Sequence, residues 1–201
     1  MSAYHEAAMG SLATGLLPLE NGSAQIGWGV GIFPIAIKEM YAALNEEERH
    51  TDLSPVSYTK VVGGQACAHQ RQVMMYLPLP MFSDRWWVTT QGTNPAIRIL
   101  SKGQMAELTW FAHKDRSEFS LDPQSESKIQ DAVWVTESSG AWLLLRLDET
   151  HTLGEYHSWS IPSGYIPTSI ASSFTAKGIK DIFDAMERYA LQNEEFCQYT
   201  W

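Results

Sequence analysis

The sequence is short of basic residues, of cysteines and of long apolar runs. Its 14 Lys and Arg are outnumbered by 23 Asp and Glu, which gives a formal net charge of -9. A protein that neutralises phosphates needs clustered Lys and Arg. No such cluster occurs in the sequence, so no nucleic-acid partner is expected. An anionic membrane surface repels the chain on average, although a local patch leaves transient membrane contact open.

The two cysteines, Cys67 and Cys197, are too few for a disulfide framework and match no zinc-ligand spacing. We expect two reduced thiols in a cytoplasmic protein. The apolar stretch near the N-terminus has no basic flank and is interrupted by Gly, Ser and Thr. The sequence therefore predicts neither a signal peptide nor a transmembrane segment.

Aromatic and sulfur-containing side chains are abundant by contrast. The chain of 201 residues contains 8 Trp and 8 Met, with 44% hydrophobic and 18% charged residues. Trp buries a large ring and Met fills irregular apolar space, so both are typical of a wide or deformable interior. The length and composition indicate one globular domain over 1–201. We divide it into an N-terminal helical extension (1–24), a core (25–192) and a tail (193–201).

Alternating side chains predict a series of strands. Residues 25–33 place bulky side chains on one face and Gly27, Gly29 and Gly31 on the other. A bare face of this kind indicates close approach by another backbone, or a strongly bent strand. Residues 114–131 are expected to be a loop, and 133–147 a hairpin. The other predicted strands, all with links short enough for antiparallel pairing, are 57–62, 66–79, 85–91, 105–113 and 153–160.

Helices are predicted near both ends of the chain. Residues 3–17 are expected to form a short helix, and an amphipathic stripe after Pro34 predicts a second one. The acidic run 46–48 is expected to be the solvated end of that helix, and a further short helix or turn follows, up to Pro55. A long helix is predicted from Pro167 to Gln192. This order indicates an α+β fold in which a curved antiparallel sheet wraps around the C-terminal helix.

Three stretches carry a resemblance to known proteins. They are 32–34 with 40–44 and His50; 77–87 with the pair Asp84 and Arg85; and 164–167 followed by Ile170, Phe174 and 182–190. In this order they resemble the START-type lipid-binding domains of the helix-grip (SRPBCC) superfamily, which also contains birch-pollen-allergen-like proteins and polyketide cyclases. The resemblance covers 25–192. It implies a helix-grip fold with an internal cavity, a hydrophobic ligand and no obligatory cofactor.

Catalytic and metal-binding patterns are scarce. The sequence contains no nucleophile elbow and no P-loop, and the glycine-rich stretch 27–31 lies inside a strand pattern. His151, Glu155 and His157 share one strand face, but three ligands on one strand span too far for one ion. Glu107 is expected to face solvent; in a flipped sheet it would be a buried general acid or base. Arg146 has apolar residues on both sides, so its face is left open.

We predict that the chain binds a lipid or another hydrophobic small molecule in an internal cavity, for transfer or sensing. The bulky strand faces would form its walls and the C-terminal helix its lid, without a metal or another cofactor. Gly178 would act as a hinge in that helix, as a source of space above the cavity, or as a cap between two helices. The predicted ligand-binding residues are Trp28, Val30, Tyr76, Arg85, Trp86, Val88, Leu108, Trp110, Leu143, Leu145, Tyr156, Phe174, Gly178, Ile182, Phe183 and Met186.

Two alternatives stay open alongside this function, although we expect binding rather than catalysis. One is an aromatase or cyclase that folds a polyketide in the same cavity, using polar groups such as Tyr76, Arg85, Glu107, Tyr156 or His157. The other is an interaction module whose cavity is filled by side chains. The volume and polarity of the cavity distinguish the three functions. The sequence does not indicate the oligomeric state.

Overall fold

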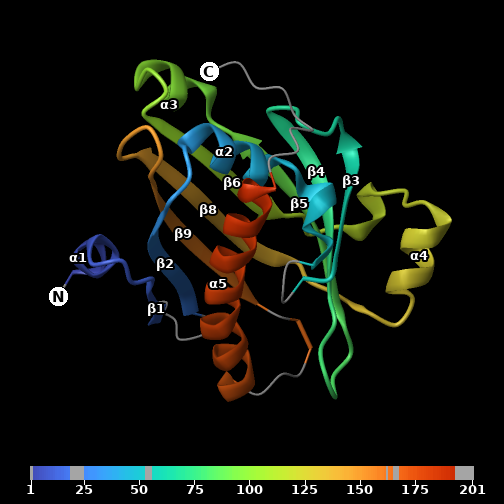
Figure 1. Ribbon diagram of the computed structural model, residues 1–201. Helices are drawn as coiled ribbons and strands as arrows, with labels where there is room; N and C mark the ends of the chain where they lie inside the picture. The colour runs from blue at the N-terminus through green and yellow to red at the C-terminus, as the bar shows by residue number, and fades with distance from the viewer. Residues whose placement is uncertain (1, 19–24, 53–55, 162, 165–167, 193–201) are drawn as a thin grey trace.

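The computed structural model describes residues 2–18, 25–52, 56–161, 163–164 and 168–192, and for 51–52 and 168–176 it describes the backbone alone. A curved sheet wraps around one long helix, α5 (Thr168–Leu191), as Figure 1 shows. The sheet has nine strands in the described ranges, in the order β1-β2-β9-β8-β6-β5-β4-β3, with β7 paired to β5. The predicted α+β helix-grip arrangement of sheet and helix is therefore confirmed.

The elements follow one another along the chain with short connections. The helices besides α5 are α1 (Ala3–Ala8), α2 (Ile37–Asn45), α3 (Pro95–Leu100) and α4 (Pro123–Ile129), with the 3-10 turns η1 (Glu47–Asp52) and η2 (Arg116–Glu118). The strands are β1 (Ala13–Pro18), β2 (Gln25–Phe33), β3 (Tyr58–Gly64), β4 (Gln70–Leu77), β5 (Arg85–Thr93), β6 (Met105–Ala112), β7 (Val133–Trp134), β8 (Glu137–Arg146) and β9 (Thr152–Ile161).

Some of the predicted elements are wrong. Residues Ala13–Pro18 are not helical but form β1, which pairs with β2. The expected loop 114–131 contains α4, where Asp122 accepts hydrogen bonds from the backbone N–H groups of Gln124 and Ser125. A capping Asp followed by Pro is a helix-start signal that the sequence contains. Residues 133–147 form no hairpin, because β7 pairs in parallel with β5 and β8 lies between β6 and β9.

The glycines of β2 allow α5 to lie directly on the sheet. A Cβ atom built on Gly29 would lie 2.8 Å from Cγ2 of Ile179 and 2.8 Å from Cε2 of Phe183. One built on Gly31 would lie 3.1 Å from Cε1 of Phe183. The expected close approach to the bare face of β2 is therefore confirmed, and this face is the concave face of the sheet.

Gly29→Ala is expected to destabilise the fold by roughly 1–3 kcal/mol, because the added methyl group overpacks the contact with α5. Chemical denaturation measures the change in the free energy of unfolding. Gly92→Ala on β5 is the matched control, since its Cβ would meet nothing closer than 3.9 Å. An equal loss of stability in both variants would show that strand conformation, rather than the helix contact, requires glycine.

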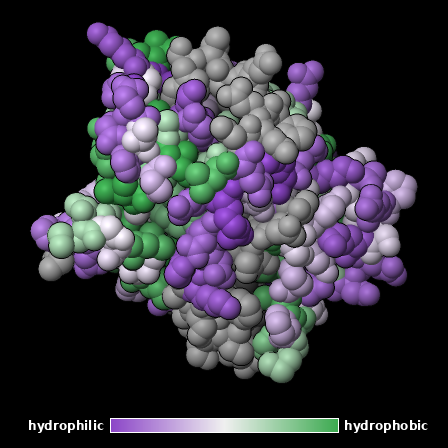
Figure 2. All heavy atoms as spheres, viewed as in Figure 1, coloured by the Kyte–Doolittle hydropathy of each residue, from purple (hydrophilic) through white to green (hydrophobic). Residues whose placement is uncertain are grey.

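The outward side of α5 is hydrophilic and its inward side is apolar. Lys177, Lys180 and Arg188 are exposed, and Figure 2 shows polar side chains along this helix. The inward stripe of Ile179, Phe183, Met186 and Ala190 belongs to the main core cluster. The predicted amphipathic helix is thus present, and it runs through Gly178 without a break, so the interpretation of Gly178 as a cap between two helices is wrong.

A second core lies on the convex face of the sheet. Met74, Trp86, Val88 and Ile129 are buried there. The rings of Trp86 and Trp134 meet edge to face at 4.5 Å between centroids. Because α4 contributes Ile129, this helix covers the outer side of β4 and β5. Both faces of β5 are therefore buried, one under α4 and one inside the curve of the sheet.

Of the expectations that bear on the protein's compartment, the reduced thiols are contradicted at Cys67 and the cytoplasmic location is untested. Cys67 takes part in a disulfide bond, so the expected reduced thiol at this position is wrong; Cys197 lies outside the described residues. Disulfides are typical of oxidising compartments, and the cytoplasmic location stays a prediction. In the part of the chain that is described, no helix is long and apolar enough to cross a membrane.

Candidate functional site

The strand register places the inward-facing residues of neighbouring strands opposite one another, in rows that run across the concave face of the sheet. Gly29 of β2 lies opposite Tyr156 of β9, and Tyr156 lies opposite Trp142 of β8. Trp142 lies opposite Leu108 of β6. Side chains of successive residues point to opposite faces of a strand, so every second residue along these strands faces α5.

Aromatic side chains fill the part of the concave face beneath the C-terminal half of α5. The ring of Phe33 stacks on that of Phe183 at 5.3 Å between centroids. The ring of Trp142 lies 4.9 Å from both Phe183 and Tyr156. Trp110 stacks on Tyr156 at 5.7 Å. These five residues, the aromatic block, pack this half of the interior tightly.

Small side chains occupy the concave face beyond the aromatic block. They are Ala112 of β6, Ser138 and Gly140 of β8, and Ser158 and Ser160 of β9, of which Ser160 is exposed at the end of the row. We call these five residues the small-residue floor. Since Gly29 lies beside Ile179 and Gly31 beside Phe183, α5 runs in the same direction as β2, and its N-terminal half extends toward this floor. The ring of Trp110 lies across Gly140, where a Cβ would overlap it, and so marks the boundary with the aromatic block.

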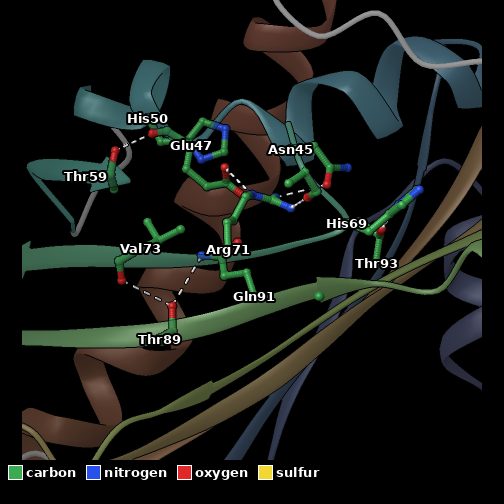
Figure 3. A network of polar contacts seen from close by, with 12 residues as sticks. Asn45, Glu47, His50, Thr59, His69, Arg71, Val73, Thr89, Gln91 and Thr93 are labelled. Carbon is green, nitrogen blue, oxygen red and sulfur yellow. Dashed lines mark hydrogen bonds and ion pairs between the residues drawn. The ribbon is translucent and has the colours of Figure 1, made fainter. Parts of the chain in front are cut away.

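A buried ion pair joins Glu47 of η1 to Arg71 of β4 (Figure 3). The side chains of Arg71 and Glu47 are 0% and 2% exposed. Arg71 Nε donates to Glu47 Oε2 at 2.8 Å, and Nη2 donates to Glu47 Oε1. Arg71 also donates to Asn45 Oδ1 at 3.0 Å and to the Ala68 carbonyl at 2.9 Å. Burial raises the pKa of the Glu47 carboxyl, and the Arg71 guanidinium opposes that shift.

Two polar residues of β5 lie beside this pair. Gln91 is opposite Arg71 on one side and Trp110 on the other. Its Nε2 donates to Thr89 Oγ1 at 3.5 Å, and Thr89 Oγ1 donates to the Val73 carbonyl at 3.4 Å. Figure 3 shows Gln91 next to the Arg71 side chain. Arg71, Gln91 and Thr89 form a polar strip that leads from the ion pair to the small-residue floor.

His50 connects η1 with the end of α5. Its ring stacks on that of Tyr189 at 5.2 Å between centroids. Its Nε2 lies 2.7 Å from the Ala43 carbonyl oxygen. Because a carbonyl can only accept, Nε2 carries the proton and donates. Burial lowers the pKa of His50 to about 4, and the nearby positive charges of Arg71 and Arg49 contribute to this shift.

The arrangement of a curved sheet around a terminal helix matches several solved structures. A STAR-related lipid transfer protein from Xanthomonas axonopodis superposes with a TM-score of 0.71 at 15% identity, over 90% of this chain and 94% of that one. Human STARD10 gives 0.67 at 13% identity, over 96% of this chain and 78% of that one. The chain has the START-type helix-grip fold. The predicted resemblance is thereby confirmed for the fold.

The START-type fold is shared with proteins of other activities. Zhui aromatase/cyclase from Streptomyces superposes with a TM-score of 0.60 at 9% identity, over 84% of this chain and 94% of that one. No protein-family model and no curated protein matches the sequence. At these identities the comparison establishes the fold, and function has to be argued from the site itself.

About half of the predicted ligand-binding residues face the interior of the sheet. Leu108, Trp110 and Tyr156 lie on the concave face, and Gly178 is buried in α5. Arg85 follows the alternation of Thr89 and Gln91 and is 2% exposed. The side chain of Phe174 lies outside the described residues. The remaining inward members, all on α5, are Ile182, Phe183 and Met186.

The other predicted residues lie on the convex face. Trp28 and Val30 point away from α5, because the glycines between them face it. In β8 the register places Trp142 and Leu144 in the core in place of the predicted pair. A shift of one residue moves a whole set of side chains to the other face. The residues concerned are Trp28, Val30, Tyr76, Trp86, Val88, Leu143 and Leu145.

Sequence reasoning missed the polar strip and its ion pair. Glu46 and Glu47 are buried, so the expected solvated helix end is wrong for both. Arg71 was a detectable signal, since a charged residue within an otherwise extended and mostly apolar stretch needs a partner when buried. The partner is 24 residues away along the chain, and no local pattern identifies it.

The polar residues Glu107, Glu155, His157 and Arg146, considered above for catalysis, metal binding or ligand anchoring, do not lie together in one site. Glu107 accepts a hydrogen bond from Asn94 Nδ2 at 2.9 Å near the surface, as expected for a solvent-facing residue. Glu155 pairs with His157 and accepts from the Tyr4 hydroxyl at 2.6 Å on the convex side. Arg146 lies at the end of β8 and pairs with Glu149. Within the described ranges, no three or more His, Cys, Asp or Glu side chains are grouped as a metal would require.

Proposed function

We propose that this START-type domain binds a lipid or another hydrophobic small molecule between the concave face and the N-terminal half of α5. The observation that carries the proposal is the small-residue floor, which lies next to the tightly packed aromatic block. Small side chains leave volume inside a curved sheet, and ligand sites typically combine an apolar lining, here the aromatic block, with a few polar groups, here the floor's serine hydroxyls. A protein with the same fold, from Xanthomonas axonopodis, is named a STAR-related lipid transfer protein, which supports this function.

The binding free energy would come from burial of the ligand's apolar surface. Each Å² removed from water contributes ~25 cal/mol, before ordering costs are subtracted. Of the five polar residues considered for a cyclase, Tyr76, Glu107 and His157 point away from the interior. Arg85 and Tyr156 face it, but a guanidinium has no lone pair to accept a proton, and burial raises the pKa of the Tyr156 hydroxyl to about 12, so neither offers a base at neutral pH. We infer that the domain holds its ligand unchanged, for transfer or sensing.

Native mass spectrometry of the protein purified from cells tests the proposal directly. We expect a mass increment that disappears on organic extraction, and the extract identifies the ligand. A protein whose mass equals that of the polypeptide, and which takes up no fluorescent fatty acid or sterol, would instead indicate an interior filled by its own side chains. Conversion of an added polyketide substrate would support the aromatase/cyclase alternative.

Ser138→Leu is expected to reduce the number of bound ligand molecules per protein by at least about half. Ser138 is 8% exposed and lies in the small-residue floor, so a larger side chain there occupies ligand volume. Titration with a fluorescent fatty acid measures the binding capacity. Ser139→Leu is the matched control, because the next residue along β8 points to the convex face. Equal capacity in both variants would place the ligand elsewhere.

A further inference from the structure

We propose that Gln91 binds a neutral hydrogen-bonding group of the ligand, such as a hydroxyl, through its side-chain amide. This inference rests on the proposed function and specifies the class of ligand. Gln91 lies in one row of the concave face, between Arg71 of β4 and Trp110 of β6. It therefore stands where the polar strip meets the edge of the aromatic block.

The side chain of Gln91 has hydrogen-bonding capacity to spare. The residue is 3% exposed. An amide offers two donor and two acceptor positions. Within the described part of the chain, the side-chain hydrogen bond of Gln91 is the one from Nε2 to Thr89 Oγ1 at 3.5 Å, which is longer than a normal N–H···O bond. A buried amide so weakly bonded is stabilised by any hydroxyl or carbonyl brought within reach.

The neighbouring charges favour a neutral ligand group over an ionic one. The Arg71 guanidinium makes four hydrogen bonds to Glu47, Asn45 and Ala68. Its charge is balanced by Glu47, which is equally buried. A carboxylate or ammonium group placed beside Gln91 would lose its hydration without gaining a counter-ion there. An amide both donates and accepts, so it suits an alcohol, a ketone or an amide.

A set of matched probes tests this inference. The probes are a pyrene-labelled alkyl alcohol, the pyrene-labelled alkane of the same length and the corresponding carboxylate. Gln91→Met keeps the length of the side chain and removes its polar atoms. We expect this variant to bind the alcohol about tenfold more weakly than the wild type and the alkane within about twofold. The wild type is expected to prefer the alcohol over the carboxylate.

Two further variants make the outcome unambiguous. Gln70→Met carries the same substitution on β4, where the exposed side chain points to the convex face, and should bind all three probes as the wild type does. Thr89→Val should weaken alcohol binding by about threefold, since it loses the contact that orients the amide. Equal weakening of alcohol and alkane by Gln91→Met, or a preference for the carboxylate, would overturn the inference. Failure of the wild type to bind any of the three probes would overturn the proposed function itself.

Discussion

Arg71→Met is expected to lower the free energy of unfolding by about 3–5 kcal/mol. The substitution removes the cation and leaves the Glu47 carboxylate buried, at 2% exposure, without its counter-ion. It also removes the donor to Asn45 and to the Ala68 carbonyl. Urea denaturation at neutral pH measures the loss. The effect is large because a single buried charge costs far more than a matched pair contributes.

The double variant Glu47→Leu, Arg71→Met is the informative comparison. Replacing both members of a buried ion pair by apolar residues of similar volume is often close to neutral, so this variant should recover most of the stability that Arg71→Met loses. Arg146→Met, which breaks the exposed pair with Glu149, should change stability by no more than about 1 kcal/mol. Equal losses in the single and double variants would show that packing, not charge, stabilises this region.

Acidification is expected to destabilise the protein through His50. Its pKa in the folded state is about 4, below the ordinary value of 6.5, because the ring is buried. The unfolded chain therefore binds the proton more readily than the folded one. The stabilising contribution of neutral His50 is complete above pH 6.5 and is lost as the pH falls toward 4, with a total of roughly 3 kcal/mol.

His50→Gln isolates this contribution from other titrations. Glutamine keeps an N–H donor for the Ala43 carbonyl but does not titrate. Unfolding free energies of the wild type and of the variant, measured at pH 7 and pH 4, give two slopes. The wild type should lose roughly 3 kcal/mol more than the variant between these values. Parallel slopes would show that protonation of His50 is not what destabilises the fold. Acid would then destabilise the fold through other groups.

Local patterns predicted elements that have one apolar face. The alternation in 25–33 predicted β2 at its observed bounds, together with the close approach that Gly29 and Gly31 allow. The stripe of Ile179, Ile182, Phe183 and Met186 predicted the helix that fills the curve of the sheet. In both cases the two faces differ sharply, so burial leaves one arrangement available.

For strands with apolar residues on both faces, the sequence did not indicate which face points toward α5. Trp86 and Val88 compete with Trp87 for the inward side of β5, and the register places the first two outward. The reason is α4, which covers the convex face and buries them. Likewise, Trp142 and Leu144, not Leu143 and Leu145, pack against Phe183 and its neighbours. No residue inside a strand encodes which of its two apolar faces another element will cover.

The amino-acid sequence by itself determined the class of the fold, the bounds of β2, the apolar stripe of α5 and the acidic charge of the chain. These properties follow from composition and from periods of two and 3.6 residues, which are local. Only the tertiary structure decided the composition of the interior: the pairing of Arg71 with Glu47, the position of Gln91 beside them, and the small-residue floor on the far side of Trp110. These contacts join residues distant in sequence, and they depend on strand register and on which helix covers which face.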